Sequence, residues 1–425
     1  EKPDAAKSYY ADTVDYFYKF LEEQRRIGDR LAQKQGEGFR RYMRTDYQED
    51  AYYYIALAYE KQDEYEQALE AYQNYLEHYP NSDRAPQIRV TLGDIYQKWA
   101  DVDENARTER LLQAIAQYES ALEHPSIKEK KRVALHNAMG DIYRLLYDTT
   151  KEEYRRGFLD RTLKEYRTSE GLLAQREHED GEEENLEQKK LEQNLAEGLA
   201  DTLLVLGTNS ADLVEQITRS VSAFQRSDPL RKRQLAEAEN QRATAEKRLS
   251  EAAVLYRRLL GLEPDASLIT QSPTVEILTS ESEKQDGAIL TNEEKDRIKK
   301  NLADAYFQMG NYNKAMDVAI PLIQDLEERD PNSEYLAPLC YLVGDAAWEV
   351  GDYERRVVDY YRKGREQNPL YPPGSGERSH KAALRMANTY FSRGLSRGDV
   401  GQLDSAISEY NRILREFPET DWTYF

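Results

Sequence analysis

The chain has 425 residues, and its 79 Asp and Glu against 59 Lys and Arg give a formal net charge of −20 at pH 7. This acidic balance argues against nucleic-acid backbones and anionic membranes as partners, and it favours basic ones. A single cysteine excludes an internal disulfide framework and a cysteine-rich metal site. No apolar run reaches transmembrane length, so direct insertion into a membrane is not expected.

Tyrosine dominates the aromatic residues, with 32 Tyr against 9 Phe, and the mean hydropathy is −0.88. These values are low for a compact enzyme and typical of thin helical arrays with much surface per residue. The chain begins at Glu1 rather than Met, which indicates a removed leader or a piece of a longer protein. Residues 1–45 have apolar residues at helical spacing without a full repeat pattern, so we expect a capping or partial repeat.

Residues 49–82 contain the clearest pattern, two amphipathic helices joined by a tight turn and closed by a proline. Small residues let the two helices approach closely, and aromatic residues fill the space beside them. The order and spacing of these residues resemble the tetratricopeptide repeat. The residues at the pattern positions are Ala56, Tyr59, Ala68, Tyr72 and Pro80. One such hairpin cannot bury its apolar face alone, so the resemblance implies neighbouring repeats.

Seven units of this kind can be aligned through the small residue of their first helix. These residues are Ala56, Gly93, Gly140, Ala200, Ala303, Gly344 and Ala387. The resemblance covers roughly residues 46–207 and 293–425. In the second unit, the interval from Tyr96 to Ala114 is 18 residues where the family has 9, which predicts a long internal loop. The third unit predicts another such loop.

Residues 208–292 interrupt the array and predict an inserted arm. Residues 212–226 and the helix that follows Pro229 carry apolar residues at coiled-coil-like spacing. An antiparallel helical hairpin is the simplest interpretation. The arm either packs back against the array or projects as a second docking surface, and the basic run at 231–233 favours projection.

The segments beside the arm are polar. The charge run at 177–190 predicts a solvated loop that leads into a helix. Residues 265–290 are rich in Ser and Thr, with a short strand predicted at 274–279. Thr291 and Glu294 form a predicted capping box that restarts the array.

Residues 293–425 hold three tidier units. In the middle one, Tyr360 is the predicted packing aromatic, and Arg356 departs from the pattern, which expects a small residue there. The Phe-Pro-x-Thr-Asp sequence from Phe417 parallels a segment that in the first repeat leads into another helix. We therefore expect the array to continue beyond the end of the chain.

No catalytic motif is present in the sequence, neither a phosphate-binding glycine loop nor an HExxH or GxSxG signature. The histidines fall mostly at repeat ends or packing positions, and Cys340 falls at a packing position. We therefore expect no enzyme activity, no metal site and no cofactor.

The resemblance implies an all-α, right-handed superhelical solenoid of helix-turn-helix repeats with an inserted helical hairpin. In this family the residue after each small position points into a concave groove, and so does the residue one turn later. Here the first set is mostly acidic and comprises Asp94, Asp141, Asp201, Asp304, Asp345 and Asn388. Such a groove should prefer basic or amide-rich segments to acidic C-terminal tails.

The second set ends in three aromatic residues, Phe307, Trp348 and Phe391, and Tyr341 is expected to face the same way. Aromatic residues flanked by hydrogen-bonding groups predict a hot spot for an extended peptide or helix. The alternative is structural. In that case the aromatic residues pack against the adjacent first helix and the aspartates bond neighbouring backbone.

These features predict a non-catalytic scaffold or adaptor that binds proteins through the groove and the arm, with its oligomeric state left open. The repeat ends resemble those of bacterial cell-envelope proteins of this family, which favours the periplasm or cell surface over the cytoplasm. One alternative is a structural subunit of a filament or large machine. Another is a domain of a regulatory or polysaccharide-export protein.

Overall fold

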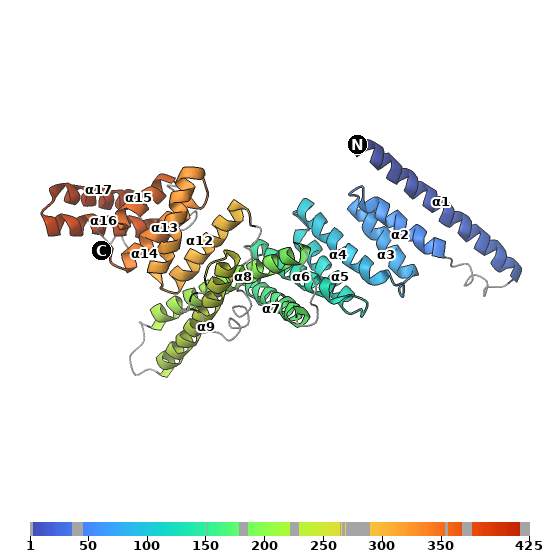
Figure 1. Ribbon diagram of the computed structural model, residues 1–425, viewed down its shortest axis with the longest axis horizontal. Coiled ribbons are helices and arrows are strands. Elements are labelled where there is room, and N and C mark those ends of the chain that lie inside the picture. Colours follow the sequence, from blue (N-terminus) through green and yellow to red (C-terminus); the bar gives the residue numbers. More distant parts are fainter. Residues whose placement is uncertain are drawn as a thin grey trace. The chain divides into compact units, whose positions relative to one another are not determined.

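The helices of the chain pair into antiparallel hairpins, and the hairpins stack in two units (Figure 1). The computed structural model describes residues 3–35, 46–150, 152–177, 186–221, 229–263, 265, 268, 290–352, 356–367 and 376–416. Unit 1 comprises Glu1–Glu182 and unit 2 comprises Glu183–Phe425. Within the described ranges every regular element is a helix and none is a strand.

Unit 1 begins with a single long helix, α1 (Pro3–Gln35), which contacts the first hairpin. Its three hairpins are α2 (Asp46–Glu60) with α3 (Tyr65–His78), α4 (Ala85–Val102) with α5 (Arg107–Leu122), and α6 (Glu129–Thr149) with α7 (Glu152–Glu177). Buried apolar side chains from Ile55 to Leu146 form one continuous core through these hairpins. Burial between neighbours is what holds such an array together, because no single hairpin encloses a core.

The described residues of unit 2 form four hairpins. They are α8 (Leu186–Val221) with α9 (Pro229–Leu259), α12 (Asn292–Gln308) with α13 (Tyr312–Arg329), α14 (Leu336–Glu349) with α15 (Val357–Gln367), and α16 (Gly376–Arg397) with α17 (Val400–Glu416). The described residues thus contain the seven predicted hairpins, and the predicted all-α repeat fold is confirmed. No helix in the described ranges is long and apolar enough to span a membrane.

Several hairpin turns depend on one residue with left-handed backbone geometry. Asp63 has a φ of 59° between α2 and α3, and glycines take this role in three turns of unit 2. Those glycines are Gly310, Gly351 and Gly398. Glycine adopts positive φ without strain, so these turns reverse the chain within a few residues.

The predicted long internal loops are wrong. Helices α4 and α5 have 18 and 16 residues and are joined only by residues 103–106. Helices α6 and α7 are longer still, with 21 and 26 residues. The extra residues lengthen both helices of each hairpin instead of looping out, because they continue to supply buried apolar side chains such as Leu111 and Leu146.

The predicted arm is continuous with the fourth hairpin. Helix α8 has 36 residues and α9 has 31, so both run well past the repeat into the predicted arm (Figure 1). Residues 222–228 at their junction, the predicted strand at 274–279 and the charged residues 178–185 lie outside the described residues. The predicted capping box before α12 is confirmed, because Thr291 Oγ1 accepts from the Glu294 backbone and the Glu294 carboxylate accepts from the Thr291 backbone.

Candidate functional site

The predicted groove aspartates of unit 1 are held by tyrosine hydroxyl groups from the second helix of the same hairpin. In the second hairpin, Tyr118 of α5 donates a hydrogen bond of 2.6 Å to Oδ1 of Asp94 on α4. In the third, Tyr166 of α7 donates one of 2.5 Å to Oδ1 of Asp141 on α6. Each aspartate is thereby oriented by a buried ring from the partner helix.

The same arrangement recurs in unit 2. Tyr256 donates to Asp201 at 2.5 Å, Tyr361 donates to Asp345 at 2.6 Å, and Tyr410 donates to Oδ1 of Asn388 at 2.6 Å. In the first hairpin of unit 1, Tyr72 instead donates a hydrogen bond of 2.8 Å to Glu60. Glu60 lies one helical turn after the residue that follows Ala56. In the structural alternative these aspartates bond neighbouring backbone; the structure shows tyrosine hydroxyls donating to Asp94, Asp141, Asp201 and Asp345, which the sequence pattern did not reveal.

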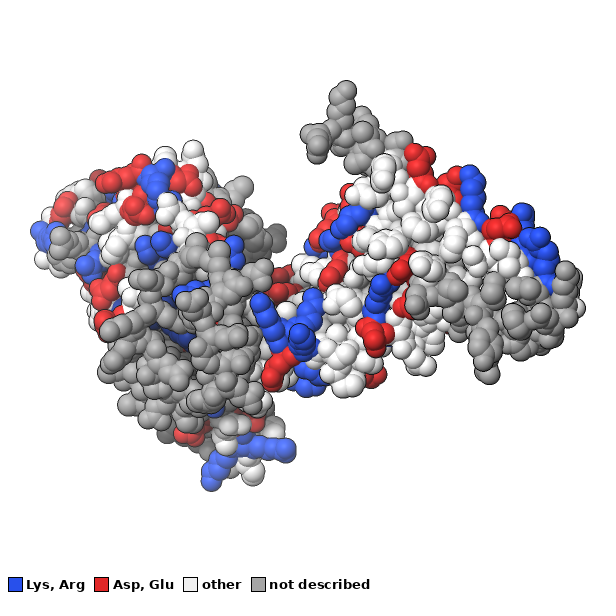
Figure 2. Space-filling model, turned by 45° about the vertical axis from the view of Figure 1, so that its right-hand side comes forward, with Lys and Arg blue, Asp and Glu red and all other residues white. Residues whose placement is uncertain are grey.

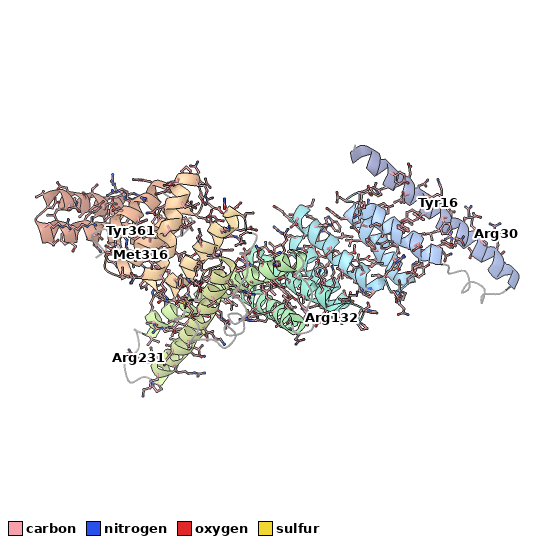
Figure 3. All side chains as sticks on the ribbon, in the orientation of Figure 1. Tyr16, Arg30, Arg132, Arg231, Met316 and Tyr361 are labelled. Carbon is pink, nitrogen blue, oxygen red and sulfur yellow. The ribbon has the colours of Figure 1, made fainter. Side chains whose placement is uncertain are left out.

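One tyrosine was placed in the wrong register. The ring that packs against Gly344 is that of Tyr361, not Tyr360, and Tyr361 lies between α14 and α15 (Figure 3). Val357 is fully buried, whereas Arg356 before it is only partly so. When the second helix is shifted by one residue, Arg356 no longer falls at the position where the pattern expects a small residue. This repeat therefore has one residue more before its second helix.

Asp94 and Asp141 are the exposed members of the acidic set. Asp141 is exposed as a whole residue, yet neighbouring protein atoms desolvate its carboxyl and raise its pKa. The hydrogen bond from Tyr166 and the charge of Arg144 lower that pKa and only partly offset the rise. The pKa of the Tyr118 hydroxyl is raised, first by burial and then by the charge of Asp94. Both side chains can therefore present an oriented carboxylate to a ligand.

Asp201 is not accessible in this way. It is 3% exposed and receives a second hydrogen bond, of 3.0 Å, from Asn301 of α12. Arg297 of α12 lies 3.5 Å from its other oxygen. Asp201 therefore joins the α8–α9 hairpin to the next one, and its role is structural.

Asp304 and Phe307 on α12 are half-buried and have local partners. Lys300 forms an ion pair of 2.7 Å with Asp304. The second helix of this hairpin carries Ala319 instead of a packing tyrosine, so Asp304 has no tyrosine clamp. The Phe307 ring contacts the Tyr312 ring edge-on, with centroids 5.3 Å apart.

Asp345 and Trp348 belong to a network centred on Arg385, whose side chain is 8% exposed. The guanidinium of Arg385 lies 2.6 Å from Asp345 and 2.6 Å from Glu349. It also lies 5.2 Å from the centre of the Trp348 ring. The arginine comes from α16, so the network joins two hairpins and neutralises the charge of Asp345.

The two remaining aromatic residues of the predicted hot spot differ in their exposure to solvent. Tyr341 is 9% exposed and packs against Tyr361 with ring centroids 6.1 Å apart, so it belongs to the core. Phe391 is 45% exposed on α16, one turn from Asn388. Phe391 is thus the most exposed member of the predicted aromatic hot spot.

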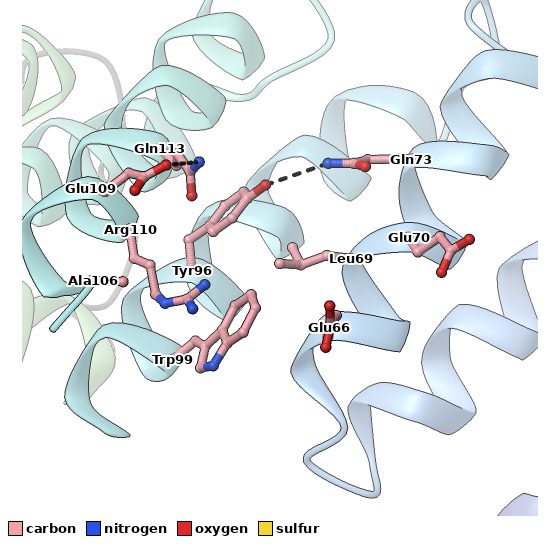
Figure 4. Close-up of a pocket in the computed structure, with 10 residues that line it drawn as sticks. All are labelled: Glu66, Leu69, Glu70, Gln73, Tyr96, Trp99, Ala106, Glu109, Arg110 and Gln113. Atoms are coloured by element: carbon pink, nitrogen blue, oxygen red, sulfur yellow. Dashed lines mark hydrogen bonds between the residues drawn. The ribbon is translucent and has the colours of Figure 1, made fainter. Parts of the chain in front are cut away.

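A pocket that the sequence did not suggest lies between the first two hairpins of unit 1 (Figure 4). It has a volume of about 360 Å³ and is lined by Glu66, Leu69, Glu70, Gln73, Tyr96, Trp99, Ala106, Glu109, Arg110 and Gln113. The guanidinium of Arg110 lies 3.1 Å from the centre of the Trp99 ring and 2.9 Å from Asp103. The helical spacing of Glu66, Glu70 and Gln73 was the available signal, but it does not reveal which helix lies opposite.

The described residues contain no group of three or more His, Cys, Asp or Glu side chains arranged to hold a metal ion. Burial raises the pKa of the Cys340 thiol to about 12, so it is a packing residue and not a nucleophile at neutral pH. On the face in Figure 2, acidic and basic side chains of the described residues are interspersed.

Comparison with known proteins gives a local match to one family model and likenesses to solved structures. The tetratricopeptide-repeat family model matches residues 50–82 and 381–420, one segment in each unit. No curated protein sequence matches the chain. A tetratricopeptide repeat protein from Parabacteroides merdae is 16% identical over 80% of this chain and 98% of that one, with a TM-score of 0.31.

Two further solved structures are similar at the same level. The assembly chaperone Acl4 of RpL4 is 15% identical over 72% of this chain and 98% of its own, with a TM-score of 0.32. Yeast Tom70 is 13% identical over 88% of this chain and 70% of its own, with a TM-score of 0.24. The family model thus matches one tetratricopeptide repeat in each unit, and several hairpins of both units pack a tyrosine against a small residue.

Proposed function

We propose that this chain is a non-catalytic protein-binding scaffold whose first helices in unit 1 bind a basic segment of a partner. The observation that carries the proposal is the pair of exposed, tyrosine-held carboxylates of Asp94 and Asp141 on consecutive hairpins. A carboxylate that is already oriented loses little side-chain entropy when a cation binds it. The net charge of −20 also attracts a basic partner over a longer range.

The two carboxylates differ in their surroundings, which gives the proposed surface a direction. Asp94 is followed one turn later by Gln97, whose side-chain oxygen lies 3.4 Å from the Tyr118 hydroxyl. Asp141 is followed one turn later by Arg144, whose charge acts on it. An amide-rich or basic stretch is favoured at Asp94, and a stretch with mixed charge is favoured near Asp141.

The groove of unit 2 supports a weaker version of the same proposal. Asp201 and Asp345 are engaged by Arg297 and Arg385, which leaves Asn388 and Phe391 as the accessible polar and aromatic pair. Such a pair suits an apolar anchor of a partner better than a basic one. We place the preference for basic segments in unit 1 only.

The test replaces both carboxylates by amides, in Asp94→Asn with Asp141→Asn. Asn388 already accepts a hydrogen bond from Tyr410, so the amide can keep the tyrosine clamp while the charge is lost. Partners are captured from the source organism and identified by crosslinking mass spectrometry. The proposal expects loss of basic partners crosslinked to α4 and α6.

The matched control is Asp101→Asn with Asp148→Asn, two exposed acidic residues on the same helices. It removes the same charge outside the proposed row and should leave the captured partners unchanged. Equal loss of captured partners in both variants would show that net charge alone attracts them. No loss in either variant would show that Asp94 and Asp141 do not bind a partner.

A second candidate function is a permanent structural subunit, and one observation favours it. The last described helix, α17, exposes Val400, Ile407 and Leu414, spaced at seven residues on one face. An exposed apolar stripe on the last described helix of a repeat array favours contact with another surface. Replacing Ile407 by Glu should then release this chain from its assembly, as measured by its size on gel filtration of native extracts.

The proposed location is a bacterial envelope or surface assembly, which rests on the resemblance of the repeat ends. The cytoplasm is the alternative location, and service in regulation or polysaccharide export is an alternative role. Fractionation of the source organism with an antibody against the chain separates the locations. A polysaccharide role would appear as retention of exopolysaccharide on the immobilised chain.

A further inference from the structure

The pocket between α3, α4 and α5 shares no residue with the predicted groove. Its carboxylates are on the second helices, Glu66 and Glu70 on α3 and Glu109 on α5 (Figure 4). The groove residues Asp94 and Asp141 are on first helices and do not line it. A volume of about 360 Å³ is within the range of pockets that hold small ligands or single side chains.

The net charge of the pocket lining is negative. Glu66, Glu70 and Glu109 are exposed, and no Lys or Arg of the described residues forms an ion pair with them. Arg110 also lines the pocket, but its ion pair with Asp103, at 2.9 Å, offsets its positive charge. The pKa of Asp103 is lowered, first by its hydrogen bond from Arg110, which marks that pair as charged.

The wall below the carboxylates is apolar and aromatic. Leu69 is 5% exposed and Tyr96 is 8% exposed, and the Tyr96 hydroxyl receives a hydrogen bond of 3.4 Å from Gln73. Arg110 covers the Trp99 ring from one direction (Figure 4). The pocket thus combines an aliphatic and aromatic slot with a carboxylate rim.

We propose that this pocket binds a cationic side chain, lysine or arginine, of a protein partner. The long methylene stem of such a residue packs on Leu69, Tyr96 and Trp99 while its charged head lies at the carboxylate rim. An acidic side chain is repelled by the rim, and a purely apolar one leaves the rim unpaired. This second docking surface does not depend on the groove, so each can fail alone.

The test measures the binding of a fluorophore-labelled pentalysine peptide to the full chain by anisotropy, at physiological salt. Glu66→Gln with Glu70→Gln and Glu109→Gln should weaken binding by about tenfold or more, since the paired charges are lost together. The matched control neutralises three exposed glutamates of unit 1 elsewhere, Glu77, Glu104 and Glu123. It should change the affinity by less than about twofold.

Two further measurements separate the pocket from general attraction. Gln113→Phe keeps every charge but fills the pocket, and it should weaken the binding of the peptide as much as the triple variant does. Asp94→Asn with Asp141→Asn should leave the pocket component intact, so a loss there reports on the groove instead. A photoreactive analogue of the peptide should crosslink to α3 and α5.

Several outcomes would overturn the proposal. Equal weakening by the triple variant and its control shows attraction to net charge alone. Unchanged binding by the Gln113→Phe variant shows that the cavity is not used. Circular dichroism of every variant checks that the helices persist, and a peptide crosslinked only outside α3, α4 and α5 rejects the site even if a variant fails to fold.

Discussion

The ring of Tyr118 lies directly on Gly93 while its hydroxyl donates a hydrogen bond of 2.6 Å to Asp94, the next residue along α4. One tyrosine therefore closes the hairpin by packing and by hydrogen bonding at adjacent positions. Gly140 with Asp141 and Gly344 with Asp345 repeat this arrangement with their own tyrosines. The small residue and the hydrogen-bond acceptor that follows it therefore stabilise the hairpin, independently of any ligand that the acceptor binds.

Gly93→Ala tests the packing half of this unit. A Cβ atom on Gly93 would lie 2.4 Å from Cε1 of Tyr118, a contact that the buried ring cannot relieve without moving α5. We expect the free energy of unfolding of unit 1 to fall by about 1–3 kcal/mol, as in other overpacked cores. Urea denaturation followed by circular dichroism measures the change.

The control for this substitution is Gly171→Ala in helix α7. Nothing lies within 4 Å of a Cβ atom built on Gly171, and this residue is exposed. Alanine there should stabilise the helix by about 0.5–1 kcal/mol. If both variants stabilise the chain, the tyrosine contact is not a constraint.

Tyr118→Phe tests the hydrogen-bonding half. The ring stays in place, but the carboxylate of Asp94 loses its donor, which should cost about 1.5–3 kcal/mol for a bond to a charged group, less where solvent replaces it. In a double-mutant cycle with Asp94→Ala, the second change should cost little once the first is made. Additive losses would show that the two groups do not interact.

The sequence predicted the hairpins because the evidence for them is local. A small residue and an aromatic at fixed spacing, as at Ala56 and Tyr72, need only one turn geometry to meet. Helix length was not predictable in this way, since the extra residues between Tyr96 and Ala114 fit a loop or two longer helices equally. The one-residue shift that selects Tyr361 over Tyr360 also depends on the length of a turn.

The candidate site was less predictable because its chemistry arises between elements. The sequence placed Asp94, Asp141 and Asp345 on the first helices, and this placement required only helical periodicity. That Arg385 neutralises Asp345 while Asp94 stays exposed depends on which hairpins stack and at what offset. The pocket at Trp99 and Arg110 depends on the same offset.

The buried tyrosines predict instability in alkali. Burial, followed by the hydrogen bond to Glu49, raises the pKa of Tyr75 to about 12 from 10.0, and burial raises that of Tyr306 to about 12. The stability that these raised pKa values contribute is fully present below pH 10, where the two tyrosines are protonated in both the folded and the unfolded chain. As the pH rises from 10 towards 12 the unfolded chain ionises first, so the stability falls.

Absorbance at 295 nm and circular dichroism, recorded together between pH 9 and about 12.5, test this prediction. Part of the tyrosine ionisation should coincide with loss of helix. Tyr75→Phe removes one raised group and should make the alkaline loss of stability shallower, compared with Tyr47→Phe, which replaces an exposed tyrosine. Complete ionisation with the helices intact would contradict the predicted linkage.

The last prediction separates two aromatic residues that the sequence placed in one hot spot. Trp348 is half-buried beneath Arg385, so Trp348→Ala removes packing and a cation–π contact and should cost unit 2 about 1–3 kcal/mol. Phe391 is 45% exposed, so Phe391→Ala should change the stability by less than about 0.5 kcal/mol. Partner binding through unit 2 should then fall in the Phe391 variant without a change in its urea midpoint. If Phe391→Ala destabilises the chain as much as Trp348→Ala, then Phe391 is a packing residue, and unit 2 retains no accessible aromatic anchor from the predicted set.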